Sequence, residues 1–535
     1  MSATTPKPPR PDTFNTRAAG VVGLAVMCSR VLGLAREQIF AALFGGGRLL
    51  DVFTIAFRIP NLLRDLFAEG ALSTAFVTIF SRTISREGDA AAFRLANKVL
   101  TLAVLTISAI TVLGIVFAPW IISVLAGGFD PAKQALTVTL ARIMFPFILM
   151  VSLAALVMGM LNARNVFGIP AMASSFFNLG SIVAGVGLGW WFDPHFGERA
   201  LLGLALGTLV GGLLQLVVQL PALRREGYRF APDFIWRDRG VLEVLRVMGP
   251  SVIAASSTQI NVTVNSMFAS HLGNGPTGWL SIAFRVMQLP LGIFGVALGT
   301  VSLPLLARLA AAGKRDDFRT ELGHGIRLAF LMTIPATVGL IVLADPIVSV
   351  LYRHGRFTID QAHGAAAALR YYALGLVGYA SLKVLVNAFY AIDRRKTPMF
   401  VSFGAVGLNL LFNWLFTWHL GWGARGLAFS TACIATTNFI VLYFLMRQEL
   451  GRFDTGALLS LTLRVGAASA GMAAVCLAST QWIFPGWESA GLWLRLAWLL
   501  ATIVVAAGVF AVCATLLKVA ELAAITSAFR RRLAR

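Results

Sequence analysis

The sequence predicts an all-α polytopic membrane protein with two six-helix lobes, related by a parallel pseudo-two-fold repeat, and two C-terminal helices. Three observations support this fold class: the composition, the length of the apolar segments and an internal repeat. Of the 535 residues, 57% are hydrophobic and only 13% are charged, whereas about a quarter of the residues in a soluble domain are charged. So low a charged fraction in so long a chain indicates many membrane spans.

The apolar segments are long and continuous. Stretches such as Leu100–Leu125 and Leu496–Leu516 reach the roughly 20 residues that a helix needs to cross the hydrocarbon core. They do not alternate between apolar and polar residues as the strands of a transmembrane β-barrel do. By the length criterion we expect about 14 transmembrane helices. Their centres lie near Val31, Ile59, Ile110, Met150, Ile182, Thr208, Ser257, Leu291, Ile334, Leu376, Leu408, Ile434, Ala468 and Val505.

The basic residues lie in short runs between these segments, so the net charge of +21 does not indicate a nucleic-acid-binding domain. Lysine and arginine concentrate in the connections that follow even-numbered spans, and the chain ends with Arg530, Arg531, Arg532 and Arg535. An excess of these residues marks the cytoplasmic side of a membrane protein. We therefore predict that both termini are cytoplasmic.

The chain also repeats itself. The matching segments are Thr54–Arg58 with Ser281–Arg285, Ala71–Arg82 with Ala297–Arg308, and Ser152–Val157 with Ser381–Val386. The pairs share nearly one offset, which contains an even number of predicted spans, so the second copy has the orientation of the first, as in two-lobed transporters with a substrate site between the lobes. The predicted parts are an N-terminal tail (1–17), an N-lobe (18–226), a C-lobe (227–452), two last spans (453–519) and a basic tail (520–535).

The second predicted span and its approach hold the densest polar cluster, formed by Asp51, Arg58, Pro60, Asn61, Arg64, Asp65 and Glu69. The first span adds Arg30, Arg36 and Glu37, and Arg285 is the repeat counterpart of Arg58. A charge at the centre of a membrane helix costs about 2.5–3.5 kcal/mol, so these groups must face a watery cavity or one another. A purely structural cluster would pair Arg58 with Asp51, Arg36 with Glu37, and Arg64 with Asp65 or Glu69. A binding cluster of arginines suits a planar anion such as a pyrophosphate, because the guanidinium group binds phosphate bidentately and keeps its charge.

Prolines and glycines predict irregular helices near this cluster. Pro60 should kink or interrupt the second span. Gly33 should loosen the first span, and the series Gly292, Gly295 and Gly299 the eighth; such backbone is tolerated where it lines a cavity. By contrast, Gly203-x3-Gly207-x3-Gly211 in the sixth span indicates close helix packing.

No metal ligand pattern is evident among the cysteines and histidines, and we expect no cofactor. Asn261, Asn265, Asn387 and Asp393 are weak candidates for oxygen ligands of a coupling sodium ion. Their alternative role is hydrogen bonding between helices, which is the commoner one for such residues in membranes.

The segments Ser29–Arg36, Pro60–Ala71 and Gln288–Pro304 resemble the MurJ/MviN family of lipid II flippases, within the multidrug/oligosaccharidyl-lipid/polysaccharide exporter superfamily. The resemblance covers nearly the whole chain. It implies alternating access between two lobes in the bacterial inner membrane, and movement of undecaprenyl-pyrophosphate-linked disaccharide-peptide from the inner to the outer leaflet for cell wall biogenesis. It places substrate binding on Arg30, Arg36, Arg64 and Arg285, with supporting roles for Glu37, Asp51, Asn61, Glu69 and Gln288.

The resemblance also implies a groove for the lipid tail in the last two spans. Asp65, Phe284 and Gln288 differ from residue types found in other members. Membrane potential, sodium and protons are alternative energy sources, and cell-wall synthesis or division proteins are expected partners beside lipid II and the bilayer. Two other functions compete: export of another polyprenyl-linked glycan or a drug, and an enzyme acting on polyprenyl phosphates. An exporter of cationic drugs would need carboxylates in place of the arginines, and an enzyme would need a carboxylate or histidine cluster on a surface loop.

Overall fold

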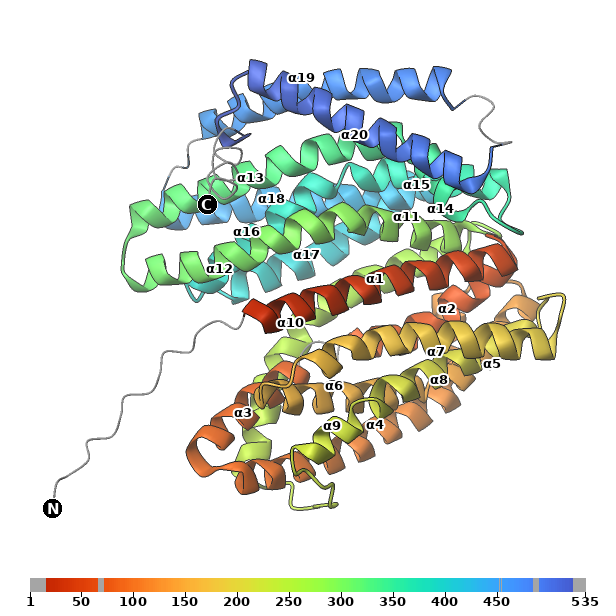
Figure 1. Ribbon diagram of the computed structural model, residues 1–535, viewed down its shortest axis with the longest axis vertical. Helices are drawn as coiled ribbons and strands as arrows, with labels where there is room; N and C mark the ends of the chain where they lie inside the picture. Colours follow the sequence, from red (N-terminus) through yellow and green to blue (C-terminus); the bar gives the residue numbers. More distant parts are fainter. Residues whose placement is uncertain (1–15, 66–71, 452, 454, 485–489, 523–535) are drawn as a thin grey trace. The chain divides into compact units, whose positions relative to one another are not determined.

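A computed structural model describes residues 16–65, 72–451, 453, 455–484 and 490–522, and in these ranges the regular structure is entirely helical (Figure 1). The chain divides into two compact units. The first unit contains Met1–Ile39, Phe57–Ala118 and Thr139–Val252, and the second contains Phe40–Ala56, Pro119–Val138 and Ile253–Arg535. Several long helices therefore begin in one unit and end in the other, and the predicted lobe boundaries stay a prediction.

The helices up to residue 225 are α1 (Thr16–Phe44), α2 (Arg48–Leu63), α3 (Leu72–Glu87), α4 (Asp89–Leu125), α5 (Pro131–Met144), α6 (Phe147–Ala163), α7 (Gly168–Phe192), α8 (Ala200–Val217) and α9 (Leu220–Arg225). In the first unit, α7 and α8 pack closely through small residues. A Cβ atom on Gly203, Gly207 or Gly211 would overlap atoms of α7. This contact confirms the packing role predicted for the glycine series.

The remaining helices begin with α10 (Arg239–Ser270), α11 (Pro276–Pro290), the π-helix η2 (Leu291–Gly295), α12 (Val296–Ala311), α13 (Arg315–Val342), α14 (Ala344–Tyr352) and α15 (Ile359–Ala373). They continue with α16 (Leu376–Ala391), α17 (Lys396–Asn413), the π-helix η3 (Trp414–His419), α18 (Ala424–Leu450), α19 (Thr455–Trp482) and α20 (Leu492–Leu516). The π-helical turn η2 falls on the glycine series of the eighth predicted span, where we expected an irregular helix.

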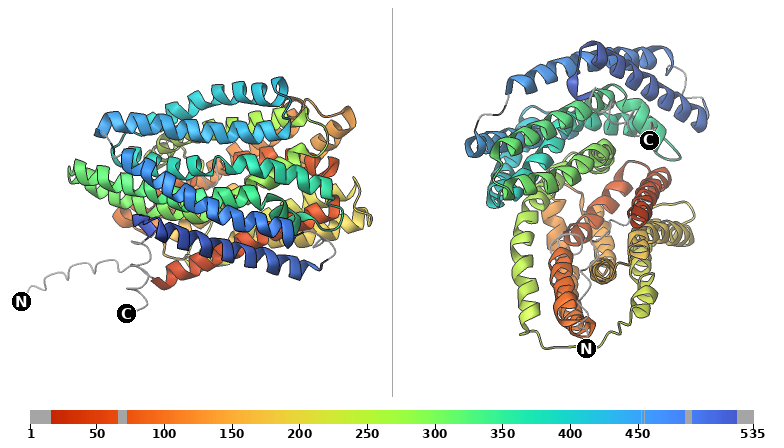
Figure 2. Two further views of the ribbon diagram at one scale, coloured as in Figure 1. Left: turned by 90° about the horizontal axis from the view of Figure 1, so that it is seen from above. Right: turned by 60° about the vertical axis from the view of Figure 1, so that its left-hand side comes forward.

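The core of the second unit is apolar. Leu322 and Ile326 of α13 are buried with Leu385 and Phe389 of α16 and with Leu442 of α18. A neighbouring cluster joins α13 to α19 and α20 through residues such as Leu331, Leu461 and Ala514. Figure 2 shows α19 and α20 lying together beside this part of the second unit. The last two helices are therefore packed onto the unit.

Nine helices in the described part of the chain are long and apolar enough to cross a membrane, or ten if the pair α15–α16, bent by 45°, forms one span. They contain the predicted centres at Ile110, Met150, Ile182, Thr208, Ile334, Leu376, Leu408, Ile434, Ala468 and Val505. The other predicted centres fall on α1, α2, α10 and the series α11–η2–α12. The multi-span fold is thus confirmed, while the full number of about 14 stays a prediction.

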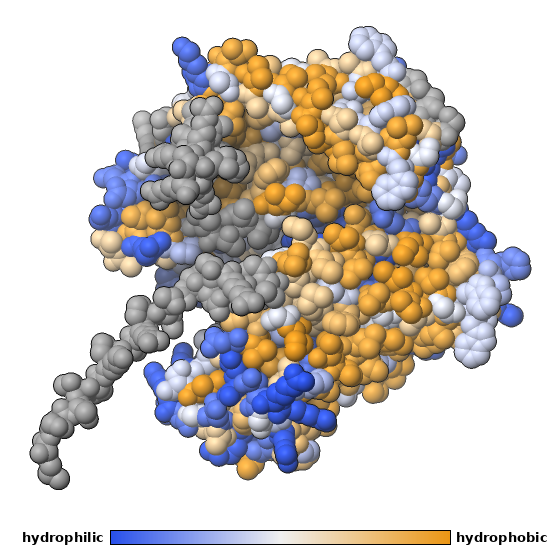
Figure 3. All heavy atoms as spheres, viewed as in Figure 1, coloured by the Kyte–Doolittle hydropathy of each residue, from blue (hydrophilic) through white to orange (hydrophobic). Residues whose placement is uncertain are grey.

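The surface fits a membrane environment. Leu113, Val116 and Trp120 of α4 are 55, 60 and 66% exposed, and Val504 and Leu516 of α20 are 69 and 75% exposed. Figure 3 shows hydrophobic side chains over much of α7 and α20. Large exposed tryptophans lie near helix ends, at Trp190, Trp191, Trp482 and Trp493. Tryptophan gathers at membrane–water interfaces, so these residues mark where the helices leave the hydrocarbon.

Candidate functional site

In the first unit, the arginines of α1 lie on a helix that is fixed against α7. The Asn178 side chain donates a hydrogen bond from Nδ2 to the Ser29 carbonyl oxygen over 3.1 Å. Gly33 faces the same asparagine, and a Cβ atom there would lie 3.5 Å from Asn178 Nδ2. Gly33 therefore sits at a packed contact within a continuous helix, which corrects our expectation that it loosens the first span.

Arg36 is held by an aromatic row. Its guanidinium carbon lies 5.0 Å from the centre of the Phe177 ring. That ring packs on Phe147 at 5.3 Å, and Phe147 packs on Phe57 of α2 at 5.5 Å between ring centres. A cation over an aromatic face is stabilised without losing its charge. Arg36 is thus oriented by the Phe177 ring, and Arg30 on the same helix is exposed.

Arg58 lies within α2, and Arg64 comes directly after its last residue. The helix runs through Pro60 to Leu63, and Arg64 and Asp65 then adopt π-helical geometry. The predicted disturbance thus comes four residues after Pro60 rather than at it. Arg64 Nη2 lies 2.8 Å from Asp65 Oδ1, so the local ion pair predicted for Arg64 is confirmed. Arg58 and Asn61 are partly buried, and Glu69 lies outside the described residues.

Arg285 belongs to the second unit. On α11 it is exposed together with Gln288, and residues three apart share one face of a helix. The preceding residue, Phe284, faces inward. Its ring packs 5.4 Å from the Tyr372 ring and 6.5 Å from the Tyr379 ring. The α11 helix therefore presents Arg285 and Gln288 on an open face. Because Arg285 and the arginines of α1 and α2 belong to different units, their convergence on one anion stays a prediction.

Asp51 of the second unit is fully buried and fully partnered. Its carboxylate accepts backbone hydrogen bonds from Gly275 at 2.6 Å and Gly278 at 2.8 Å, at the start of α11. Lys133 Nζ lies 3.0 Å from Asp51 Oδ2 and donates to Asn274 Oδ1 at 2.9 Å. We call these five residues the Asp51 network. A buried carboxylate needs such partners, and a helix N-terminus supplies both amides and a favourable dipole.

Lys133 is thus the cation that Asp51 contacts in the second unit, whereas the sequence led us to expect Arg58. Lys133 is itself almost fully buried, and its Nζ lies 3.8 Å from the centre of the Phe129 ring. From the sequence we counted Lys133 only among the few basic residues of the less basic side and assigned it no contact. The one available signal was its place beside Asp130 in a loop otherwise poor in basic residues.

Other hydrogen bonds close the same end of the second unit. The Gly46 amide donates to Gln361 Oε1 at 2.6 Å, and Trp279 Nε1 donates to the Gly46 carbonyl at 2.8 Å. The Arg356 amide donates to the Ala42 carbonyl at 2.8 Å. A Cβ atom on Gly46 would overlap the Phe357 ring, so this approach requires glycine. The connections around residues 45–47, 127–131, 271–275 and 353–358 therefore meet at one end of the second unit.

The amide candidates for a sodium site form a ladder between helices. Asn409 of α17 donates from Nδ2 to Asn261 Oδ1 at 2.9 Å, and Asn413 donates to Asn265 Oδ1 at 2.8 Å. Asn265 Nδ2 also donates to Thr431 Oγ1 of α18 at 3.0 Å. Interhelical hydrogen bonding is thus confirmed for Asn261 and Asn265.

The other sodium candidates lie elsewhere in the fold. Asn387 lies on α16, and the Asp393 side chain is 90% exposed beside Arg395. Among the described residues, no group of three or more histidine, cysteine, aspartate or glutamate side chains is placed to hold a metal ion.

At the loops of the first unit, charge pairs hold the connection to α10. Asp238 accepts a hydrogen bond from Lys98 Nζ at 2.8 Å and one from the Gly240 amide at 2.9 Å. The Lys98 hydrogen bond, together with that amide, lowers the pKa of the Asp238 carboxyl below its ordinary value. Tyr228 donates to Asn97 Oδ1 at 2.6 Å, and burial raises the pKa of its hydroxyl. The connection is therefore fixed along α4.

The chain is similar to known proteins over most of its length. Residues 40–497 match the family model described as lipid II flippase MurJ. A protein of Burkholderia cenocepacia named lipid II flippase MurJ is 36% identical over 439 residues, which are 81% of this chain and 84% of the relative. A probable lipid II flippase MurJ of Haemophilus influenzae is 32% identical over 514 residues, 92% of this chain and 98% of the relative.

Solved structures give the same grouping. A structure described as lipid II flippase MurJ in an inward closed conformation superposes with a TM-score of 0.75 at 25% identity, covering 96% of this chain and all of the other. An inward-facing multidrug resistance transporter of the MATE family superposes with a TM-score of 0.69 at 16% identity, covering 81% of this chain and 98% of the other, which shows a shared fold. On the family match and the identity of its relatives, this chain belongs to the lipid II flippase MurJ family.

Proposed function

We propose that the protein flips lipid II from the inner to the outer leaflet of the bacterial inner membrane, for peptidoglycan synthesis. The observation that carries the proposal is the placement of arginines on α1 and α11 and at the end of α2, helices that are not among those found long and apolar enough to cross a membrane in the described part of the chain. A guanidinium group on such a helix is suited to a pyrophosphate, because it binds phosphate oxygens in pairs and stays charged when desolvated. No cofactor or chemical step is required for this transport.

The proposed binding arginines are Arg30, Arg36, Arg64 and Arg285. Arg36 supports this role because the Phe177 ring orients its guanidinium group without removing its charge. Arg64 shares its charge with Asp65, so its contribution is the weaker one. In this proposal the N-lobe (18–226) and C-lobe (227–452) enclose the headgroup, and the lipid tail follows the last two helices (453–519).

The Asp51 network supports alternating access. It lies among the connections that carry few basic residues, which the positive-inside rule places in the periplasm. In the proposed cycle the network holds the periplasmic end closed while lipid II enters from the cytoplasm. Outward opening must then withdraw Asp51 from the Gly275 and Gly278 amides, and binding of substrate or coupling to an ion gradient would supply that free energy.

The test is a leaflet-accessibility assay on cells or proteoliposomes. Arg30→Ala and Arg285→Ala should abolish translocation while the protein still inserts at normal levels. The matched control is Arg395→Ala, since the Arg395 side chain is 74% exposed in a surface connection and should translocate normally. Normal translocation by both Arg30→Ala and Arg285→Ala would exclude the substrate role. Repeating the assay under imposed potential, sodium or proton gradients would identify the energy source.

Topology is tested separately. A cysteine at position 48 should react with an impermeant reagent from the periplasmic side, and one at position 315 only after the cytoplasmic side is opened. The reverse pattern would overturn the proposed orientation with both termini in the cytoplasm.

A further inference from the structure

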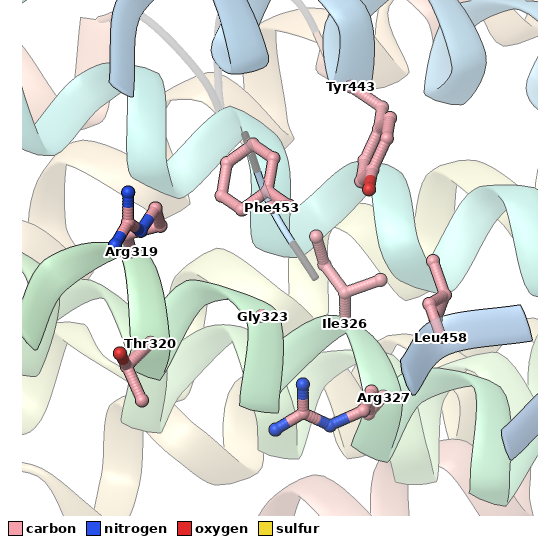
Figure 4. Close-up of a pocket in the computed structure, with 8 residues that line it drawn as sticks. All are labelled: Arg319, Thr320, Gly323, Ile326, Arg327, Tyr443, Phe453 and Leu458. Carbon is pink, nitrogen blue, oxygen red and sulfur yellow. The ribbon is translucent and has the colours of Figure 1, made fainter. Parts of the chain in front are cut away.

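The second unit contains a pocket of about 390 Å³ away from the proposed transport arginines, lined by Arg319, Thr320, Gly323, Ile326, Arg327, Tyr443, Phe453 and Leu458. We call it the α13 pocket. Its volume falls in the range of small-ligand sites, about 300–1,000 Å³. Figure 4 shows the two arginines on α13 at one side, with Tyr443 and Phe453 opposite them. One wall is therefore cationic and the other aromatic.

The spacing on α13 forms the cationic wall. Arg319, Gly323 and Arg327 are four residues apart and share one face of the helix, and the arginines are separated by about 12 Å along the axis. Between them Gly323 has no side chain to fill the pocket. A Cβ atom built there would contact only Arg327 Nη1, at 3.6 Å. The pocket therefore has two guanidinium groups with a cleared space between them.

The arginines differ in how firmly they are held. Arg327 Nε lies 2.8 Å from Glu521 Oε1, and both side chains are mostly buried. Arg319 pairs with Asp316 at 3.0 Å, but the Asp316 side chain is 88% exposed. An exposed ion pair of this kind contributes little to the stability of the fold, about 0–1 kcal/mol. Arg319 can therefore exchange its partner for a ligand anion, while Arg327 stays in place.

The depth of the pocket matches the headgroup layer of the membrane. The membrane-length helix α20 ends at Leu516, and Arg464 of α19 donates to the Lys518 carbonyl at 3.1 Å just beyond it. Glu521, the partner of Arg327, follows within one turn. On the outer surface of α19, Leu459 and Leu463 are 60 and 65% exposed. The pocket thus lies where apolar surface gives way to charge.

We propose that the α13 pocket binds an anionic phospholipid of the surrounding bilayer, with the phosphodiester on Arg319 and Arg327 and the chains along Leu459 and Leu463. Charge-assisted hydrogen bonds from guanidinium groups recognise phosphate oxygens. The apolar wall of Ile326, Phe453 and Leu458 receives the glycerol ester region. Such a lipid would brace α19 against α13, independently of any transport event.

The test uses the purified full-length protein and native mass spectrometry with phosphatidylglycerol, phosphatidylcholine or glycerol phosphate. The wild type should retain phosphatidylglycerol more tightly than phosphatidylcholine. Arg319→Gln should weaken phosphatidylglycerol roughly tenfold, as expected for one charge-assisted hydrogen bond. Gly323→Leu should block the pocket by volume without removing a charge. Gly323→Ala serves as the folding control, because its Cβ fits.

The matched charge control is Arg315→Gln. Arg315 is an exposed arginine on the same helix outside the pocket lining, so this variant should bind as the wild type does. Equal phosphatidylglycerol binding by the wild type, Arg319→Gln and Gly323→Leu would overturn the proposal, as would equal affinity for phosphatidylcholine. Glycerol phosphate binding as tightly as phosphatidylglycerol would show a soluble-phosphate site in place of a lipid site.

Discussion

The helices α1, α2, α10 and α11–η2–α12 differ from the rest of the described membrane domain. Each of the other nine or ten spans contains an apolar stretch long enough to cross a membrane, and α4 and α20, for example, expose large hydrophobic side chains such as Val116 and Val504. The first set carries charges within the predicted spans on α1, α2 and α11, and the asparagines of α10 are hydrogen-bonded to those of α17. A lipid-facing helix cannot carry such groups cheaply. We call the helices that carry these groups the polar set and the other spans the apolar set.

The internal repeat relates the polar helices of the two predicted lobes. In the predicted lobes, α1 and α2 open the N-lobe, and α10 and α11 open the C-lobe, so the polar helices occupy equivalent positions in the two copies. Arg58 and Arg285 are the corresponding residues. In the proposed function the first two spans of each lobe would therefore carry the substrate-binding groups.

The first prediction compares the effect on translocation of replacing one arginine in the polar set and one in the apolar set. Arg36→Ala should reduce lipid II translocation at least tenfold, because it removes a charged donor to the pyrophosphate. Arg142 of α5 instead donates from Nε to the Ile115 carbonyl at 3.2 Å, a contact within the first unit. Arg142→Ala should keep translocation near the wild-type rate.

Arg36→Lys adds a second control in the same assay. It keeps the charge but loses the planar fork, so its rate should fall between those of the wild type and Arg36→Ala. Equal rates for Arg36→Ala and Arg142→Ala would remove the distinction between the two sets of helices.

The second prediction concerns the Asp51 network, in which Asp51 of α2 contacts Lys133 of α5. Asp51→Asn should lower the free energy of unfolding by about 3–5 kcal/mol, because it leaves Lys133 buried without its counter-charge. Lys133→Met in the Asp51→Asn background should recover part of that loss, which a double-mutant cycle by thermal unfolding would detect. Asp130→Asn is the control, since Asp130 lies in the same loop with a half-exposed side chain. Simple additivity of Asp51→Asn and Lys133→Met would contradict the pairing.

Features that depend on local sequence were predictable, namely the apolar spans, the charged positions and one ion pair between adjacent residues. Hydropathy located the apolar spans, because a helix facing lipid is apolar on every side and leaves a continuous signal. The charges of the polar helices were also visible in the sequence, and the family resemblance selected which arginines to expect in the binding site. The Arg64–Asp65 pair was predictable because the residues are adjacent.

The partners of Asp51 were not predictable. Two are backbone amides of Gly275 and Gly278, and an amide donor has no side-chain signature in a sequence. The third, Lys133, is 82 residues away, in the first turn of α5, whose position depends on the tertiary fold. Likewise, the position of Arg36 over Phe177 depends on how α7 packs on α1. Long-range contacts of this kind require the fold itself.

The third prediction tests the apolar set alone. Gly207→Leu in α8 should destabilise the protein by about 1–3 kcal/mol, because the larger side chain would overpack the contact with Gly185 of α7. Gly187→Leu is the control, since no atom lies within 4 Å of a Cβ built there. Thermal unfolding in detergent measures both. The folded fraction of Gly207→Leu should still translocate lipid II, and a specific loss of transport at normal stability would show that α8 does more than support.

The smallest expected effect is at Asp238, outside both sets of helices. Its carboxyl has a lowered pKa in the folded protein because of Lys98, so the group stabilises the fold above the unfolded pKa of about 3.9. That contribution is lost as the pH falls through the lower, folded pKa. Since the Asp238 side chain is 35% exposed, the effect should be below about 1 kcal/mol. Asp238→Asn should therefore flatten the loss of thermal stability between about pH 5 and pH 3, while leaving translocation unchanged at neutral pH. An identical pH profile for the wild type and Asp238→Asn would mean that the Lys98 contact does not anchor the connection to α10.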